Sequence, residues 1–158
     1  AGSIGRATEV GAVANSIARA LTRIYQDKGI AFSVECDPDL RFQGEKQDLE
    51  EMLGNLLDNA AKWAATKVVL TASMVDPATA SPKHARNLEI HVSDDGPGLT
   101  DAQLAEPIKR GRRLDETKPG SGLGHSIVAE LAHSYRGTFS LHRSPLGGLE
   151  ARLFLPAT

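Results

Sequence analysis

The spacing of apolar positions predicts two amphipathic helices, and a third helix is expected further along the chain. In residues 7–27 apolar side chains recur at intervals of three and four, as they do on one face of a helix. This stripe is formed by Val10, Val13, Ala14, Ile17, Leu21 and Ile24. A second helix is predicted over residues 46–64 and a third over residues 123–135. The apolar side of the second helix is formed by Leu49, Met52, Leu53, Leu56 and Ala60.

Strands are predicted where apolar and polar residues alternate between turn residues. They cover residues 30–36, 41–42, 67–74, 87–93, 137–143 and 149–155. Residues 76–86 are expected to form an exposed loop, and residues 96–120 a polar, basic loop with little helix. Helices interleaved with hairpin-like strand pairs predict an α/β fold. We expect a two-layer sandwich in which a mixed β-sheet is covered on one face by helices.

Composition narrows the class of protein. With 158 residues, of which 41% are hydrophobic and 24% charged, the chain fits one globular domain. A net charge of −2 argues against a general nucleic-acid binder. Because Cys36 is the single cysteine, an internal disulfide is excluded. No apolar run approaches the roughly 20 residues that cross a bilayer, so we expect no membrane contact by this domain. Residues 1–6 are predicted to be an expression scar or linker.

The predicted helix over 46–64 carries a polar stripe on an otherwise core-forming segment. Successive helical residues turn by about 100°, so the stripe spans an arc of roughly 80°. It consists of Glu51, Asn55, Asn59 and Lys62. Two carboxamides one turn apart beside a carboxylate and a lysine suit Mg²⁺ that is shared with phosphates. A solvated helix face is the alternative that this helix alone leaves open.

Two glycine-rich turns lie further along the chain. Asp94-Asp95-Gly96-Pro97-Gly98 closes a predicted strand. Its glycines allow the backbone to approach a ligand, and a carboxylate there could accept a hydrogen bond from an exocyclic amine such as that of adenine. Gly120-Ser121-Gly122-Leu123-Gly124 precedes a helix, whose N-terminal N–H groups favour an anion. Either motif alone could be an ordinary turn or a flexible connection.

Five cations lie between the two glycine turns. They are Lys109, Arg110, Arg112, Arg113 and Lys118. Such a loop could fold over phosphates, and a solvated basic loop is the alternative. Its place between two glycine-rich turns favours phosphate contact.

Taken in order, these motifs resemble the catalytic ATP-binding domain of bacterial sensor histidine kinases. That domain belongs to the GHKL (HATPase) family, shared with gyrase, MutL and heat-shock chaperone ATPases. Residues 51–63 resemble the N box, 94–98 the G1 box and 120–124 the G2 box. The phrases GNLLDNAAKW, DDGPGL and RGRRLDETKPGSGLG are especially similar to the PhoQ-like branch, the magnesium-responsive sensor kinases. The resemblance implies a Bergerat-type ATP-binding fold, with residues 7–158 as the catalytic ATP-binding domain.

The resemblance also implies ATP and Mg²⁺ as cofactors and a role for each motif. Asn55 and Asn59 would hold Mg²⁺, and Glu51 would polarise the attacking group. Asp94 would bind the adenine amino group, and Arg113 would reach the terminal phosphates as a catalytic cation. The remaining residues implied to bind the nucleotide are Lys62, Trp63, Gly96, Gly98, Lys118, Gly120, Ser121, Gly122, Leu123 and Gly124.

The sequence departs from the family pattern at two places. Glu106-Pro107-Ile108 stands where the lid often begins with phenylalanine, and His125 stands where the family generally has leucine. The five histidines are His84, His91, His125, His133 and His142, and none is followed by an acidic residue. We therefore expect the phosphate-accepting histidine on a separate dimerisation domain of the same parent protein.

The resulting expectation is a cytoplasmic histidine kinase domain of a two-component system, whose parent is an inner-membrane sensor. It would bind ATP, would not autophosphorylate efficiently on its own, and would act upstream of a response regulator. Two alternatives stay open. One is a GHKL-type ATPase conformational switch in which Glu51 activates water, and the other is a degenerate, non-catalytic binding module.

Overall fold

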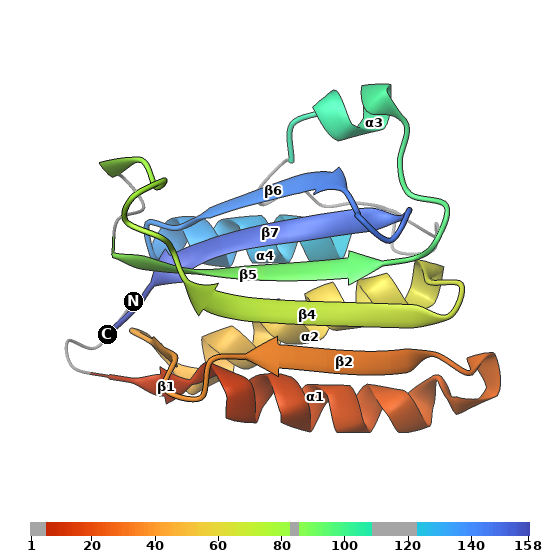
Figure 1. The fold of residues 1–158 in the computed structure, drawn as a ribbon, viewed down its shortest axis with the longest axis horizontal. Coiled ribbons are helices and arrows are strands. Elements are labelled where there is room, and N and C mark those ends of the chain that lie inside the picture. Colours follow the sequence, from red (N-terminus) through yellow and green to blue (C-terminus); the bar gives the residue numbers. More distant parts are fainter. Residues whose placement is uncertain (1–5, 83–85, 109–122) are drawn as a thin grey trace.

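A five-stranded sheet and a layer of helices make up the fold (Figure 1), seen in a computed structural model that describes residues 6–82, 86–108 and 123–158. The helices are α1 (Val10–Ile24), α2 (Lys46–Trp63), α3 (Asp101–Ala105) and α4 (Leu123–Ser134), with a 3₁₀ turn at Gln26–Lys28. The strands are β1 (Thr8–Glu9), β2 (Ala31–Cys36), β3 (Arg41–Phe42), β4 (Lys67–Met74), β5 (Asn87–Asp94), β6 (Thr138–Arg143) and β7 (Leu149–Pro156). The predicted α/β sandwich is confirmed.

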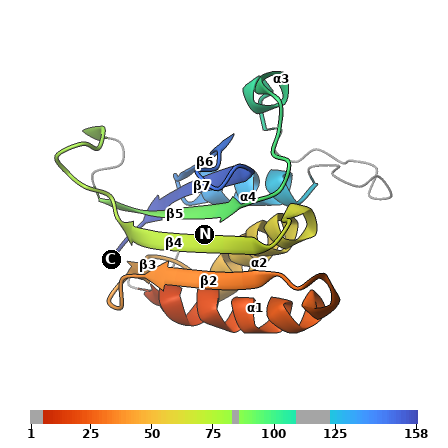
Figure 2. The ribbon, with the colours of Figure 1, turned by 45° about the vertical axis from the view of Figure 1, so that its right-hand side comes forward.

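The sheet is mixed, with the strand order β2-β4-β5-β7-β6. Only the β2–β4 pair is parallel among these neighbours; the other three pairs are antiparallel. Because parallel neighbours need a crossover connection, the chain returns through α2 between β2 and β4. This crossover lays α2 across the same face of the sheet as α1 and α4 (Figures 1 and 2).

The core lies between the sheet and these three helices, with α2 in the middle of the helical layer. The predicted apolar side of α2 is buried as expected, and Leu49, Met52 and Leu53 are 0% exposed. Two tyrosines fasten the flanks of α2. The Tyr25 hydroxyl, just after α1, donates to the Asp58 carboxylate at 2.7 Å, and the Tyr135 hydroxyl, just after α4, donates to Asp48.

Two predicted segments differ in detail from the observed elements. The helix expected over 7–27 begins at Val10, because Thr8 and Glu9 pair with Phe42 and Arg41 in a small separate sheet. It ends at Ile24 and is followed by the 3₁₀ turn and Gly29, whose φ is +72°. The loop expected over 96–120 contains the five-residue α3, started by a capping box between Thr100 and Gln103. Residues 1–5 and 109–120 lie outside the described part of the chain.

The two ends of the described chain lie together. Arg41 pairs with Glu9 in the small sheet, and the Arg41 carbonyl accepts a hydrogen bond from Thr158 N–H. This corner is close to Asn87, which pairs with Pro156 at the start of β5. Asp94 lies at the opposite end of β5, roughly 24 Å away over seven steps of about 3.4 Å. The predicted site is therefore remote from both ends (Figure 1).

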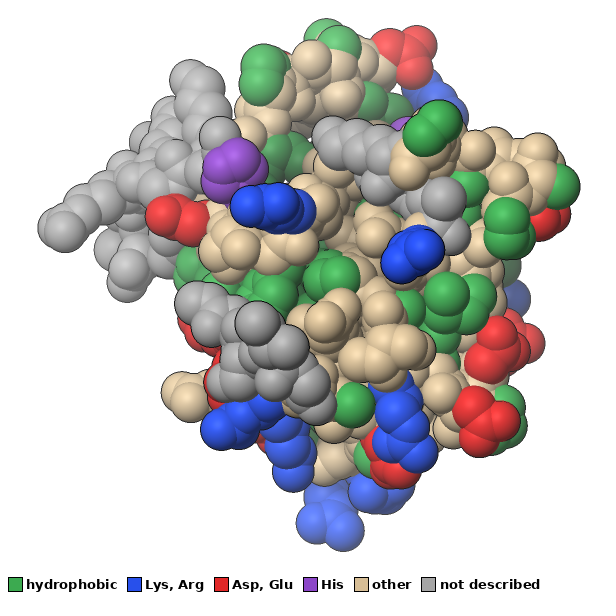
Figure 3. All heavy atoms as spheres, turned by 90° about the vertical axis from the view of Figure 1, so that its left-hand side faces the viewer, with side chains coloured by type: hydrophobic (Ala, Val, Ile, Leu, Met, Phe, Trp, Pro, Cys, Tyr) green, Lys and Arg blue, Asp and Glu red, His purple; other side chains and the backbone are tan. Residues whose placement is uncertain are grey.

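The surface at this end of the molecule is mixed in charge. Basic and acidic side chains lie side by side on the face that carries the chain ends (Figure 3). Among the described residues, no helix has both the length and the apolar character needed to cross a membrane.

Candidate functional site

The polar stripe of α2 lies away from the core, as its spacing predicts. Glu51 is exposed, whereas Asn55 and Asn59 are partly buried. Asn55 Nδ2 donates to the Glu51 carbonyl at 2.8 Å, a bond that fixes the amide along the helix surface. Lys62 and Trp63 are the last two residues of α2, and Trp63 is 41% exposed.

The first turn of α4 lies against the middle of α2. Asn59 Nδ2 is 3.1 Å from Nε2 of His125. Burial lowers the pKa of His125 to about 4, so the ring is neutral at pH 7. A Cβ added at Gly124 would lie 3.2 Å from Asn55 Oδ1, so a glycine permits this close approach. The structure therefore brings Asn55 and Asn59 to the end of the second glycine motif.

The turn after β5 lies against the C-terminal end of α2. A Cβ added at Gly96 would come within 2.2 Å of the Trp63 carbonyl oxygen, so only glycine fits without a shift. Gly98 has a φ of +70° and lies next to the Gly148 carbonyl. The two glycine motifs thus meet the same helix, one at its middle and one at its end.

Asp94 is the buried carboxylate of this turn, only 3% exposed. Its Oδ1 accepts hydrogen bonds from Gly96 N–H at 2.8 Å and from Leu149 N–H at 3.3 Å. Burial raises the pKa of Asp94, although both hydrogen bonds act in the opposite direction. No donor among the described residues reaches Oδ2. Because no buried side-chain oxygen of the described residues lacks a partner, Oδ2 is the oxygen of this carboxylate that solvent or a ligand can reach.

The chemistry of α2 fits a hard cation. The contacts of Asn55 and Asn59 described above use their amide nitrogens. Among the described residues, no donor reaches the Oδ1 atom of either side chain. Neutral oxygen ligands of this kind suit Mg²⁺ that keeps waters and shares phosphates. Within the described ranges, no group of three or more His, Cys, Asp or Glu side chains could hold a metal ion by itself.

Two residues next to the site make contacts that the sequence did not predict. Asp95 accepts hydrogen bonds from the N–H groups of Ala65, Thr66 and Lys67 and from the Thr66 hydroxyl. It therefore ties the turn after β5 to the start of β4. Lys28 Nζ donates to the carbonyls of Ala61 at 2.9 Å and Lys62 at 2.6 Å, which closes the C-terminal end of α2. Neither contact leaves a local signal in the sequence.

Several predicted site residues fall outside the described part of the chain. These are Arg113, Lys118, Gly120, Ser121 and Gly122, together with the other cations of the basic loop. Leu123 is the first residue of α4.

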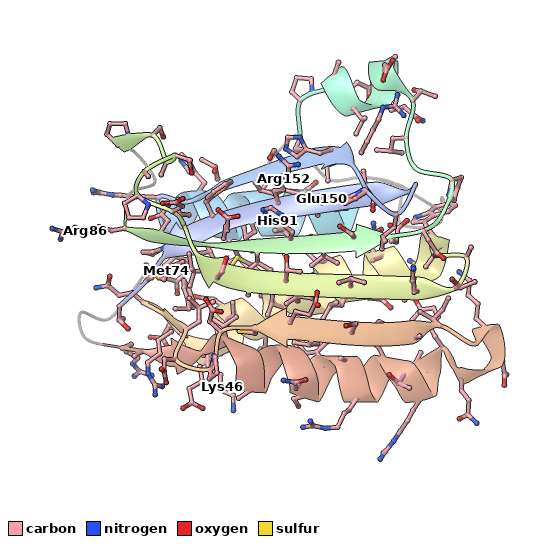
Figure 4. The ribbon with its side chains drawn as sticks, viewed as in Figure 1. Lys46, Met74, Arg86, His91, Glu150 and Arg152 are labelled. Carbon is pink, nitrogen blue, oxygen red and sulfur yellow. The ribbon has the colours of Figure 1, made fainter. Side chains whose placement is uncertain are left out.

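The outer face of the sheet, which the helices leave uncovered, holds a separate polar cluster (Figure 4). His91 of β5 lies between two carboxylates, 2.9 Å from Glu150 and 3.3 Å from Glu89. Arg152 Nε donates to the same Glu150 at 3.0 Å. Glu150 is buried by these partners, so the cluster is a self-satisfied ion-pair network on the face opposite α2.

Sequence comparison finds one family and a set of sensor kinases. The family described as histidine kinase-, DNA gyrase B-, and HSP90-like ATPase matches residues 44–158. The sensor protein kinase CarS of Pseudomonas aeruginosa is 40% identical over 134 residues, covering 85% of this chain and 28% of that protein. The virulence sensor histidine kinase PhoQ of Salmonella typhimurium is 34% identical over 134 residues, covering 85% and 26%. The chain thus spans about a quarter of the length of these relatives.

Solved structures agree with this comparison. The mycobacterial sensor histidine kinase MprB superposes with a TM-score of 0.76 at 25% identity, covering 96% of this chain and 97% of that chain. The ATP-binding domain of PrrB from Mycobacterium tuberculosis superposes with a TM-score of 0.73 at 26% identity, covering 96% of each chain.

Proposed function

Because this chain belongs to the family of histidine kinase-, DNA gyrase B- and HSP90-like ATPases, we propose that α2 and its two glycine motifs form one site for ATP with Mg²⁺. In a sensor histidine kinase this site would supply the γ-phosphate for transfer to a histidine. One observation carries the proposal. The middle of α2, which carries both carboxamides, meets the start of α4, and the end of α2 meets the turn that follows Asp94, so both glycine motifs lie against one helix.

Asp94 supplies the adenine end of the proposed site. Its Oδ1 is held by two backbone N–H groups, which leaves Oδ2 to accept a hydrogen bond from the exocyclic amine. Trp63 is partly exposed at the end of α2 and would border the nucleotide. Gly96 and Gly98 keep the turn free of side chains next to the base.

The phosphate end is built from the stripe of α2 and the start of α4. Asn55 and Asn59 would hold Mg²⁺ through their amide oxygens, and the ion would neutralise phosphate charge. Phosphoryl transfer needs positioning and charge neutralisation rather than covalent chemistry from the protein. Lys62 would contact phosphate, and Glu51, exposed on the same stripe, would orient the attacking group. Arg113, Lys118 and residues 120–124 would complete the phosphate contacts.

The whole parent protein is part of the proposal. The acceptor would be a histidine on a dimerisation and phosphotransfer domain of the same parent, which then passes the phosphate to a response regulator. Two of the described histidines already contact other side chains of this domain. His91 lies in the ion-pair network of the sheet and His125 contacts Asn59. The parent would be a membrane sensor that carries this domain on its cytoplasmic side.

Calorimetric titration with a non-hydrolysable ATP analogue tests the proposal directly. We expect saturable binding that strengthens when Mg²⁺ replaces EDTA. An absence of both heat and thermal stabilisation at millimolar analogue would contradict the proposal and favour a non-catalytic binding module. Rapid, steady phosphate release by this domain alone would instead favour an ATPase conformational switch in which Glu51 activates water.

A further inference from the structure

The contact between His125 and Asn59 joins two different motifs of the site. His125 lies in the first turn of α4 and Asn59 in the fourth turn of α2. Their side-chain nitrogens are 3.1 Å apart. The imidazole also packs on Phe139 of β6, with ring centroids 5.7 Å apart and an interplanar angle of 52°. The ring is therefore held in place from the sheet side while one edge faces the carboxamide.

The direction of this hydrogen bond follows from the chemistry of both groups. A neutral imidazole has one donor nitrogen and one acceptor nitrogen, and a carboxamide has a donor nitrogen and an acceptor oxygen. With Asn59 Nδ2 as the near atom, this bond requires Nε2 of His125 to accept, which is the tautomer that carries its ring proton on Nδ1. The bond occupies the nitrogen end of the carboxamide. The amide oxygen is then the atom left for a ligand.

A rotated carboxamide would have the opposite effect. It would present its NH₂ group, which carries partial positive charge, where a cation needs an oxygen. An asparagine side chain can turn about its terminal bond at little cost, because that torsion is broad and roughly two-fold. A partner that distinguishes the two ends is needed to select one of them.

We infer that His125 is a positioning residue for nucleotide binding, which holds the Asn59 carboxamide by its nitrogen and keeps its oxygen available to Mg²⁺ of bound Mg–ATP. The inference rests on the proposed function, because it requires Mg–ATP at this site. His125 itself touches neither metal nor nucleotide. Leucine, which the family generally has here, has no polar atom and could not make this contact.

A packing role alone would predict a different result. If the contact only joins α2 to α4, its loss lowers thermal stability and leaves the metal dependence of binding unchanged. The informative quantity is therefore the ratio of the Kd for a non-hydrolysable ATP analogue in EDTA to the Kd in Mg²⁺.

We expect His125→Leu to lower this ratio by about 2- to 10-fold, the effect of losing one neutral hydrogen bond. His125→Gln should restore it to within about twofold of wild type, because the glutamine oxygen lies as many bonds from Cβ as Nε2 does. His133→Leu is the matched control, since His133 is exposed in the last turn of the same helix. Its ratio should equal that of the unaltered chain.

A ligand-free measurement accompanies the titration. In the ¹⁵N-labelled domain, Nε2 of His125 should have the shift of an unprotonated nitrogen, and His125→Leu should move the Asn59 side-chain amide signals. If His125→Leu does not fold, the wild-type nitrogen shift and the glutamine variant still decide the question.

Three results would overturn the inference. These are an unchanged ratio in folded His125→Leu, a glutamine variant as impaired as the leucine variant, and a protonated Nε2 in the free domain. Failure of the proposed function would look different. In that case the unaltered chain itself would show no Mg²⁺-dependent binding of the analogue.

Discussion

Among single residues, Asp94 offers the sharpest test of nucleotide choice. Its Oδ1 is occupied by two backbone N–H groups, so in the proposed site the choice of base would depend on Oδ2. We expect Asp94→Asn to weaken the binding of the ATP analogue at least about 10-fold, because a hydrogen bond to a charged group contributes about 1.5–3 kcal/mol. Competition titration against a fluorescent nucleotide measures the change.

Inosine triphosphate is the matched control for this prediction. It carries a ring carbonyl where adenine carries the amine, so its oxygen would face the Asp94 carboxylate. The unaltered chain should prefer ATP, and Asp94→Asn should lose most of that preference. Equal affinities of the unaltered chain for the two nucleotides would rule out this role for Asp94.

Asp95 acts on stability rather than on binding. Hydrogen bonds from Thr66, Lys67 and Ala65 outweigh the effect of burial and lower the pKa of Asp95. The folded state therefore favours its charged form, and this contribution is present at neutral pH. It is lost as the pH falls below about 4, where the unfolded carboxylate takes up its proton first. We expect Asp95→Asn to lower the free energy of unfolding by about 2 kcal/mol at pH 7.

The difference between Asp95→Asn and the unaltered chain should shrink between pH 7 and pH 3 in urea unfolding. Asp39→Asn provides the control, because Asp39 is exposed in the turn between β2 and β3. That variant should remain within about 0.5 kcal/mol at both pH values. A difference for Asp95→Asn that stays constant with pH would contradict the role of its charge.

Whether a feature of the candidate site could be predicted depends on how far apart in the sequence the interacting residues lie. Helical spacing and a strand-end turn are local patterns, so the positions of Asn55 and Asn59 on one side of α2 and of Asp94 at the end of β5 could be predicted, and their roles stay predictions. Asp95 could not, since its donors lie 28 to 30 residues earlier. The contact between Asn59 and His125 spans 66 residues and depends on how α2 and α4 pack.

At the level of elements, the β6–β7 hairpin and the turn after β5 fit together through Gly148. A Cβ added there would lie 2.1 Å from Asp94 Oδ1 and 2.6 Å from the Asp94 carbonyl oxygen. We expect Gly148→Ala to destabilise the fold by about 1–3 kcal/mol and to weaken ATP binding, because Asp94 must move. Thermal unfolding and the analogue titration measure the two effects.

Gly54→Ala, in the interior of α2, should act in the opposite direction. A Cβ at Gly54 meets nothing within 4 Å, and alanine favours the helix by about 0.8–1.0 kcal/mol over glycine. We expect a higher free energy of unfolding in urea, with unchanged affinity for the ATP analogue. A loss of stability in this variant would mean that α2 is not a regular helix at this position.

Element types were predicted well where their periodicities are strong, and the short strand at 41–42 was also predicted, whereas β1 and α3 were not. Strand β1 was not predicted, because two residues are too few to show a periodicity and Thr8–Glu9 pair with residues 32 or more positions away. The five-residue α3 was not predicted, because the segment around it is rich in glycine and proline. Its start depends on the capping box of Thr100.

For the whole molecule, the family and the two-layer architecture followed from the order of motifs and are confirmed by the matching family and the solved structures. The strand order of the sheet could not be predicted from the order of the motifs. The parallel neighbour of β2 is β4, and β7 lies between β5 and β6, which are not adjacent. Such pairings depend on long-range packing that no local pattern specifies. This order leaves one sheet face to the ion pairs of His91, Glu150 and Arg152.

Because Glu9 and Thr158 both bind Arg41, the first and last described segments of the fold lie together, which matters for how such a fold can be combined with others. A polypeptide that enters and leaves a fold at one point can be spliced into a loop of a host protein without stretching either of them. The same proximity lets the ends be joined and the chain reopened at an exposed loop.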